Sequence, residues 1–128
     1  MKLLLDTCCW LWWLGDISKL TQQQLDAIIN RQNQLFLSAA TLWELSIKVN
    51  NNKLTIPQPL NKLVEQQCPI DNITILDIKA HHTIHAGNLI LHHKDPFDRM
   101  IITQGSIENL IIVTSDIIFQ KYDVSILL

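Results

Sequence analysis

Four acidic side chains stand where a helix is expected to begin. They are Asp6, Glu44, Asp98 and Asp116. Four carboxylates brought together repel one another and raise one another's pKa values. A divalent cation relieves this repulsion, and Mg²⁺ and Mn²⁺ prefer oxygen ligands. Such a cluster can orient a water molecule, lower its pKa and stabilise an in-line displacement at phosphate. The pattern therefore predicts phosphate-ester chemistry, provided that the fold gathers the four acids.

Two of these acids also have a structural explanation from the first half of the chain. Asp6 follows a short apolar run and fits the N-cap of a helix that starts near Trp10. Glu44 fits a capping box with Thr41, because the two residues are three positions apart. Glu44 also precedes Lys48 by four residues, a spacing and order that favour an ion pair on a helix. Taken alone, Glu44 is better explained as a structural residue than as a catalytic one.

The other two acids can likewise be explained by a helix start. Asp95 would cap a helix, Pro96 would take its first position, and Asp98 would favour the positive end of its dipole. Asp116 follows Thr114 and Ser115 and fits a first-turn acid in the same way. The case for chemistry depends on the four acids occurring together.

The elements that must position these acids alternate between strands and helices. Short apolar runs predict strands, and amphipathic or proline-initiated segments predict helices. The predicted strands are 3–5, 35–37, 73–76, 110–113 and 124–127. The predicted helices are 10–14, about 20–30, 41–50, 59–67, 79–88, 96–107 and 116–121. This alternation is typical of an α/β fold with a mainly parallel central sheet, whose ligands bind outside the carboxyl ends of the strands.

Length and composition set the class of protein. A chain of 128 residues fits one domain, and a hydrophobic content of 48% supports a packed core. The formal net charge is −2, from 10 Lys and Arg against 12 Asp and Glu. That balance is not typical of a protein that coats nucleic acid by charge alone. If nucleic acid is the ligand, we expect a bound cation to neutralise the negative charge of the acids.

Cysteine usage and hydropathy indicate the compartment. The three cysteines, Cys8, Cys9 and Cys68, give no closed disulfide framework, so we expect reduced thiols in a cytoplasmic protein. Asp6 interrupts the apolar N-terminal run, and no small-residue cleavage site follows it. No apolar stretch reaches 18 residues, so no membrane span is expected.

Histidines form two groups. His81, His82 and His85 share a predicted helix, but no Glu or Cys near them completes a metal motif, so surface or partly buried roles are favoured. His92 and His93 precede the Asp95–Asp98 segment, where they either contact RNA phosphate or position the loop.

Four stretches of the chain carry a family resemblance. They are Leu-Leu-Leu-Asp-Thr at 3–7 with Leu-Trp-Trp at 11–13; Ser-Ala-Ala-Thr-Leu-Trp-Glu-Leu-Ser-Ile-Lys at 38–48 with Lys-Leu at 53–54; His-His-Lys-Asp-Pro-Phe-Asp-Arg at 92–99; and Val-Thr-Ser-Asp at 113–116. In this order and content the sequence resembles the PIN-domain family, and within it the VapC-like toxins of bacterial type II toxin–antitoxin pairs. The stretch at 92–99 is the most specific of the four.

The resemblance implies a fold, an activity and partners. It implies one PIN-like domain over residues 1–128, with three layers and a central sheet of about five strands. It implies an endoribonuclease that uses Mg²⁺ or Mn²⁺ to cleave single-stranded RNA, with a cognate antitoxin and a homodimer as partners. The acidic metal site falls on Asp6, Glu44, Asp98 and Asp116. Asp95 is expected beside the ligands or as a cap, and the residues expected to contact RNA are Lys48, His93, Lys94 and Arg99.

The chain departs from the expected subgroup pattern at a few places. Cys8 stands where a His often follows the Asp-Thr pair, and Gly105 should weaken its helix by roughly 1 kcal/mol relative to Ala. None of the departures removes an acid, so they bear on substrate preference more than on chemistry.

Two rival functions remain open from the sequence. One is a phosphohydrolase with an aspartyl nucleophile at Asp6, although Cys8 occupies the position where the haloacid dehalogenase pattern has a second Asp. The other is a PIN-like interaction module that has lost catalysis. No arrangement of Ser, Cys or His in the sequence supports nucleophilic catalysis.

Overall fold

The computed structural model describes residues 1–128 and contains five strands, six α-helices and two short 3₁₀ helices. The strands are β1 (Lys2–Leu5), β2 (Gln34–Ser38), β3 (Ile73–Leu76), β4 (Ile111–Val113) and β5 (Ile126–Leu127). The helices are α1 (Thr7–Gly15), η1 (Ile17–Lys19), α2 (Gln22–Ile29), α3 (Ala39–Asn50), α4 (Leu60–Ile70), α5 (Ala80–Asn88), α6 (Pro96–Ile107) and η2 (Ile117–Lys121). The predicted α/β alternation is confirmed, and η1 is an element that the sequence pattern did not predict.

All five strands run parallel in one sheet with the order β3-β2-β1-β4-β5. The chain moves outward from β1 through β2 to β3 and then returns to the other side of β1 with β4 and β5. The direction of winding therefore reverses between β1 and β4. In open parallel sheets that point is where ligands bind, outside the carboxyl ends of the strands.

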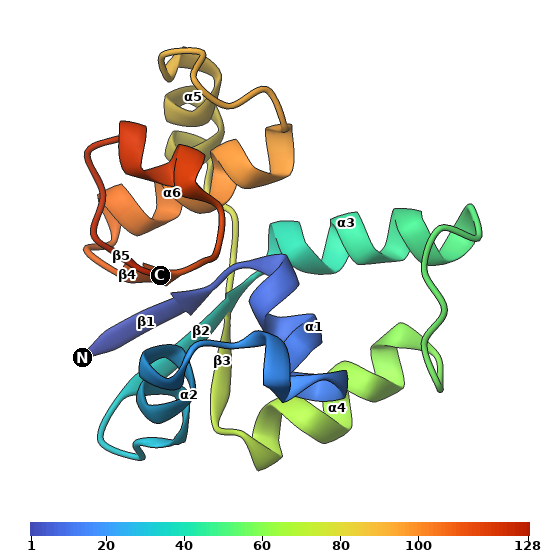
Figure 1. The fold of residues 1–128 in the computed structure, drawn as a ribbon. Coiled ribbons are helices and arrows are strands. Elements are labelled where there is room, and N and C mark those ends of the chain that lie inside the picture. Colours follow the sequence, from blue (N-terminus) through green and yellow to red (C-terminus); the bar gives the residue numbers. More distant parts are fainter.

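Two hydrophobic clusters cover the two faces of the sheet. Leu3 and Leu5 of β1 pack in one cluster with residues of α1, α2, α3 and α4. Leu4, between them, packs on the opposite face with Ile101 and Ile102 of α6. Successive side chains of a strand point to opposite faces, so a strand buried on both sides is apolar without alternation. Figure 1 shows the resulting layers, with α1, α2 and α4 on one side of the sheet and α5 and α6 on the other.

Helix starts follow local capping chemistry. Asp6 caps α1 by accepting a hydrogen bond from the Cys9 amide at 2.8 Å, so this helix begins at Thr7, earlier than the predicted start near Trp10. The predicted cap at Asp95 is confirmed, because its Oδ1 accepts from the Phe97 and Asp98 amides.

The capping box predicted between Thr41 and Glu44 is wrong. Helix α3 begins two residues earlier than expected, at Ala39, with Ser38 as its N-cap. The side chain of Thr41 is instead hydrogen bonded to the Thr7 hydroxyl at 2.9 Å. Glu44 therefore lies in the second turn of α3, and capping does not account for its buried carboxylate.

None of the helices combines the length and the apolar character that crossing a bilayer requires.

Candidate active site

The carboxyl ends of the two strands at the reversal point each deliver an acid. Asp6 directly follows β1, and Asp116 lies three residues after the end of β4. The Thr114 hydroxyl joins them: it donates to Oδ2 of Asp6 at 2.6 Å and accepts from the Asp116 amide at 3.0 Å. Asp116 in turn caps η2 by accepting from the Ile118 amide at 2.9 Å. Both acids thus combine a capping bond with a place at the sheet edge.

Helix α3 brings Glu44 to the same edge. The Thr7 hydroxyl, one residue after Asp6, donates to Oε1 of Glu44 at 2.9 Å, and Lys48 contacts Oε2 at 3.0 Å. The predicted ion pair between Glu44 and Lys48 is therefore confirmed. Only 9% of the Glu44 side chain is exposed, whereas 45% of the Lys48 side chain is exposed. The pKa of Lys48 is raised, chiefly by the hydrogen bond to Glu44.

Helix α6 supplies the fourth acid, Asp98, in its first turn. Burial and the charges of Asp95, Glu44 and Asp6 together raise the pKa of Asp98 to about 7, whereas His93 opposes the shift. This dependence on three other acids means that the fold gathers the predicted carboxylates at one place. A cation bound beside Asp98 would offset the negative charge of its carboxylate. It would therefore favour the ionised form, which is the form that binds metal.

Burial acts on Asp6 as well. Desolvation raises its pKa, and the hydrogen bonds from Thr114 and Cys9 oppose that shift. Asp6 is 5% exposed. The chain therefore places an acid deep at the end of β1 and stabilises its charged form with two protein donors, which is how a buried carboxylate is kept available as a ligand.

His93 lies within the acidic cluster. Its Nε2 is 2.9 Å from Oδ2 of Asp116 and 3.1 Å from Oδ2 of Asp98. The sequence marked His93 as a candidate RNA contact and gave no indication of these two contacts, because they join residues 5 and 23 positions apart. His93, Asp98 and Asp116 have donor atoms close enough to hold one metal ion.

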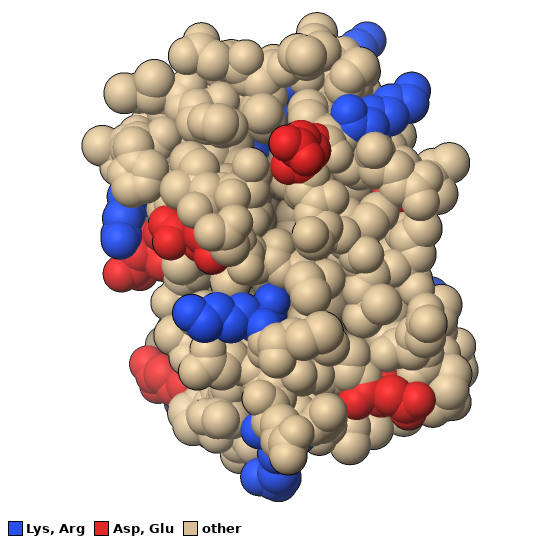
Figure 2. Space-filling model, turned by 90° about the vertical axis from the view of Figure 1, so that its left-hand side faces the viewer, with Lys and Arg blue, Asp and Glu red and all other residues tan.

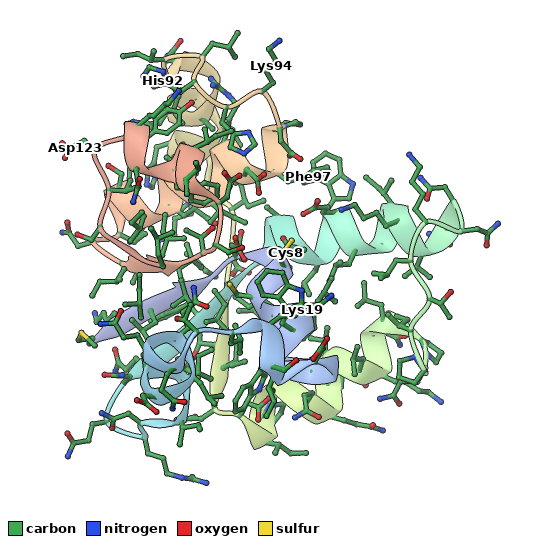
Figure 3. The ribbon with its side chains drawn as sticks, viewed as in Figure 1. Cys8, Lys19, His92, Lys94, Phe97 and Asp123 are labelled. Atoms are coloured by element: carbon green, nitrogen blue, oxygen red, sulfur yellow. The ribbon has the colours of Figure 1, made fainter.

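Cys8 lies beside the cluster at the start of α1, close to the beginning of α3 (Figure 3). Burial and the charges of Asp6 and Asp98 raise its pKa. The nucleophilic form of cysteine is the thiolate, and a raised pKa keeps the thiol protonated at neutral pH. The structure thus adds a neutral thiol to the site and no activated nucleophile. All three cysteines are free.

The basic residues predicted to contact RNA fall into different surroundings. Lys48 lies at the acids, and Lys94 is exposed and points away from the body of the protein (Figure 3). The prediction for Arg99 is contradicted. Its guanidinium is buried and donates to the carbonyl oxygens of Ala86, Leu89, Ile90 and His93 at 2.8–3.3 Å. Arg99 therefore holds the loop before α6 in place through backbone carbonyl oxygens.

The histidine group on α5 is structural at His82. This side chain is fully buried, and its Nδ1 accepts the Lys79 amide at 2.9 Å. A neutral imidazole has one donor and one acceptor, so Nε2 carries the proton and donates to Glu108 at 2.9 Å. A metal at Nε2 would require the proton to move to Nδ1, where it would face the Lys79 N–H. His82 thus does not complete a metal site with the neighbouring His81 and Glu108.

Basic side chains do not form a continuous patch on the face of the protein seen in Figure 2, where they lie singly among uncharged and acidic groups. This distribution agrees with the net charge of −2.

A family model described as the PIN domain matches residues 3–125. A chain from the crystal structure of VapBC2 from Rickettsia felis, bound to a DNA fragment from their promoter, has a TM-score of 0.70 and 18% identity, with coverage of 99% of this chain and 98% of that chain. A chain of VapBC-1 from nontypeable Haemophilus influenzae has a TM-score of 0.69 and 14% identity, with 99% and 97% coverage.

A chain of FitAcB from Neisseria gonorrhoeae has a TM-score of 0.54 and 23% identity, with coverage of 98% of this chain and 96% of that chain. No curated protein matches the chain in sequence. At these identities the solved structures establish a shared fold over nearly the full length of both partners in each comparison.

Proposed function

This chain belongs to the PIN-domain family, and we propose that it is a metal-dependent endoribonuclease with an active centre formed by Asp6, Glu44, Asp98 and Asp116. The observation that carries the proposal is the convergence of these acids, from four separate segments, on the reversal point of the sheet. Thr7 donates a hydrogen bond to Glu44, and Thr114 donates one to Asp6. His93 is hydrogen bonded to Asp116 and lies 3.1 Å from Asp98. If these acids served only as helix caps, they would not need to lie close enough to raise one another's pKa values.

The donor set fits Mg²⁺ or Mn²⁺. All four side chains offer carboxylate oxygens, which are the ligands that these hard cations prefer. Asp6, Glu44, Asp98 and Asp116 would hold the ion directly or through water, with Asp95 adding negative charge beside Asp98. When bound, such an ion supplies a water molecule of lowered pKa and neutralises negative charge that develops at phosphate.

The protein's own groups prepare this site for an anionic substrate. The Thr7 hydroxyl donates to Glu44 and the Thr114 hydroxyl donates to Asp6, and these hydrogen bonds orient the two carboxylates. Lys48 extends from Glu44 with nearly half of its side chain exposed, so its ammonium can contact a phosphate without leaving the site. The Cys8 thiol stays protonated and takes no part as a nucleophile. These roles are consistent with attack by water and with no covalent intermediate on the chain.

RNA is the substrate class that we propose, together with a protein antitoxin and a homodimer as assembly partners. The VapBC and FitAcB neighbours support the fold on which the toxin assignment rests. The exposed side chain of Trp43, which is 62% exposed and packs edge-on against Phe97, is available for a protein interface because Trp is enriched in such contacts. Co-expression with the protein encoded by the adjacent open reading frame, followed by co-purification, tests the antitoxin.

Cleavage of RNA oligonucleotides tests the main proposal. The wild-type protein should cleave single-stranded RNA with Mg²⁺ or Mn²⁺ and stop when EDTA is added. Asp6→Asn and Asp98→Asn should each lose at least about 100-fold in rate, since each removes a charged ligand. Asp123→Asn is the matched control, because this exposed acid lies away from the site (Figure 3). If both site variants cleave as fast as the wild type, the assignment fails.

The rival functions give different results in the same preparations. An acyl-phosphate trapped on Asp6 would favour the aspartyl-nucleophile phosphohydrolase. A wild-type protein that binds neither Mg²⁺ nor Mn²⁺ in calorimetry, when purified without a partner, would favour the inactive interaction module.

A further inference from the structure

His93 is fixed in place by contacts that do not involve the acids. Its backbone amide donates to the Tyr122 hydroxyl at 2.8 Å, and its carbonyl oxygen accepts from Arg99 at 3.1 Å. Its ring packs edge-on against Phe119, with ring centroids 5.8 Å apart. The side chain is 12% exposed. The imidazole therefore occupies a defined position that the surrounding fold sets.

The hydrogen bonds of the ring assign its tautomer. Nδ1 of His93 accepts the backbone N–H of Asp95 at 3.2 Å, so it carries no proton. In the neutral imidazole the proton then resides on Nε2. That N–H donates to Oδ2 of Asp116 at 2.9 Å, and the same Nε2 lies 3.1 Å from Oδ2 of Asp98. A metal ion at Nε2 would need the proton on Nδ1, where it would face the Asp95 N–H.

The two acids that His93 joins belong to elements of different rigidity. Asp98 lies in the first turn of the 12-residue helix α6, whereas Asp116 caps the five-residue helix η2, and its side chain is 34% exposed. Without His93 between them, two carboxylates this close would repel each other, and only the hydrogen bond from the Ile118 amide would hold the Asp116 carboxylate. One N–H contacting Oδ2 of both carboxylates leaves Oδ1 of Asp98 for another partner.

We propose that His93 is a positioning residue that holds Asp98 and Asp116 together for the metal ion, as an N–H donor and not as a ligand. This inference rests on the metal-dependent function proposed above and assigns the residue that organises its site. Carboxylates that bind metals are themselves commonly held by hydrogen bonds, and loss of such a partner typically costs about 10–100-fold in metal affinity or activity. The loop that Arg99 and Tyr122 hold in place thus presents the His93 N–H to the two acids.

Calorimetric titration with Mn²⁺ tests the role of His93 directly. His93→Ala should weaken Mn²⁺ binding by about 10–100-fold. His93→Gln should stay within a few-fold of the wild type, because its amide can donate to the same oxygens. His92→Ala is the matched control: His92 is the exposed neighbour, and its ring packs against Tyr122 outside the cluster. It should bind Mn²⁺ as the wild type does. Far-UV circular dichroism and thermal unfolding confirm that each variant is folded.

Three outcomes would overturn the proposal. The first is wild-type affinity in His93→Ala, and the second is equal loss in the Gln and Ala variants. The third is a nitrogen hyperfine coupling in pulsed electron paramagnetic resonance of bound Mn²⁺ that disappears in His93→Ala, which would make His93 a direct ligand. A wild-type protein that binds no Mn²⁺ overturns the proposed function itself and, with it, the role of His93. A wild type that binds Mn²⁺ and cleaves RNA while His93→Ala binds equally well refutes only the positioning role.

Discussion

The Thr114 hydroxyl connects the carboxylate of Asp6 to the backbone of Asp116, donating to Oδ2 of Asp6 at 2.6 Å and accepting from the Asp116 amide at 3.0 Å. These two contacts tie the carboxyl end of β1 to the segment that follows β4, across the point where the sheet reverses its winding. A neutral, fully buried side chain thus sets the relative position of two proposed metal ligands.

Thr114→Val should weaken metal binding with little effect on the fold. Valine keeps the shape of threonine but lacks the donor that opposes the raised pKa of Asp6, so that pKa should rise further. We expect about a tenfold loss of Mn²⁺ affinity near neutral pH, measured by calorimetry. Thr114→Ser retains the hydroxyl and should stay close to the wild type. Equal affinity in the Val and Ser variants would show that the hydroxyl does not prepare the site.

Asp98 should make the metal-free protein less stable as the pH rises. Its pKa is about 7 in the folded protein against an ordinary value of 3.8, so the folded state binds more protons than the unfolded state between these values. Its contribution to stability is therefore fully present below about pH 4 and is lost as the pH rises through about 7. Asp6 acts in the same direction, because its pKa is also raised.

Thermal unfolding in EDTA between about pH 5 and about pH 8 measures this effect. The wild-type midpoint should fall with rising pH, whereas Asp98→Asn should show a flatter profile and a higher midpoint at the alkaline end. Asp123→Asn should follow the wild type, since this acid is exposed. Saturating Mn²⁺ should raise the wild-type midpoint most at the alkaline end, because the ion binds the ionised site. A profile that is just as steep in Asp98→Asn as in the wild type would contradict the assignment.

Local sequence signals predicted the strands and the helix starts well, because both depend on short-range patterns. The unbroken apolar run Leu3–Leu5 indicated a strand buried on both faces, and the two hydrophobic clusters confirm it. The Asp95-Pro96 pair indicated the start of α6 for the same reason, since caps act within a few residues. The parallel order of the strands then brought their acids to one edge.

The errors fall where distant parts of the chain compete for a side chain. Thr41 had the spacing of a cap, but Ser38 caps the helix and Thr7, 34 residues away, takes the Thr41 hydroxyl. Arg99 looked like a phosphate contact, but its Nη1 and Nη2 groups donate four hydrogen bonds to carbonyl oxygens that only the tertiary fold brings close. No local pattern reports such partners, and the place of His93 was missed for the same reason.

Lys48 should contribute one phosphate contact to RNA binding. Its ammonium lies 3.0 Å from Glu44 and its side chain is 45% exposed, so Lys48→Gln should remove a charge at the site without unfolding α3. In the Asp6→Asn background, where cleavage is slow, the dissociation constant for single-stranded RNA should rise. The slope of its logarithm against the logarithm of salt concentration should fall by about 0.7, as expected for one lost contact to a single strand.

Lys62→Gln, an exposed lysine on α4, provides the control for the loss of charge alone. Its salt slope should equal that of the parent protein. A slope that is unchanged in Lys48→Gln, or reduced equally in both variants, would place Lys48 outside the RNA contact and leave it as the ion-pair partner of Glu44.

Gly105 should resist replacement by alanine, although alanine is the better helix former by roughly 1 kcal/mol. A Cβ at this position of α6 would lie 2.6 Å from Cδ1 and 2.7 Å from Cγ1 of Ile112, a fully buried residue of β4. Overpacking of a buried contact typically costs about 1–3 kcal/mol. Gly105→Ala should therefore lower the free energy of unfolding, measured by urea denaturation, by up to about 2 kcal/mol once the gain in helix propensity is included.

The double variant Gly105→Ala, Ile112→Val separates the steric clash from other causes. Ile112→Val removes Cδ1, the atom closest to the added Cβ, and alone should cost about 0.5–1.5 kcal/mol. Valine keeps Cγ1, which lies 2.7 Å from the added Cβ, so the substitution relieves the clash in part. The double variant should therefore be somewhat more stable than the sum of the two single effects allows. Strict additivity would mean that the close approach of α6 to β4 at Gly105 does not limit this position.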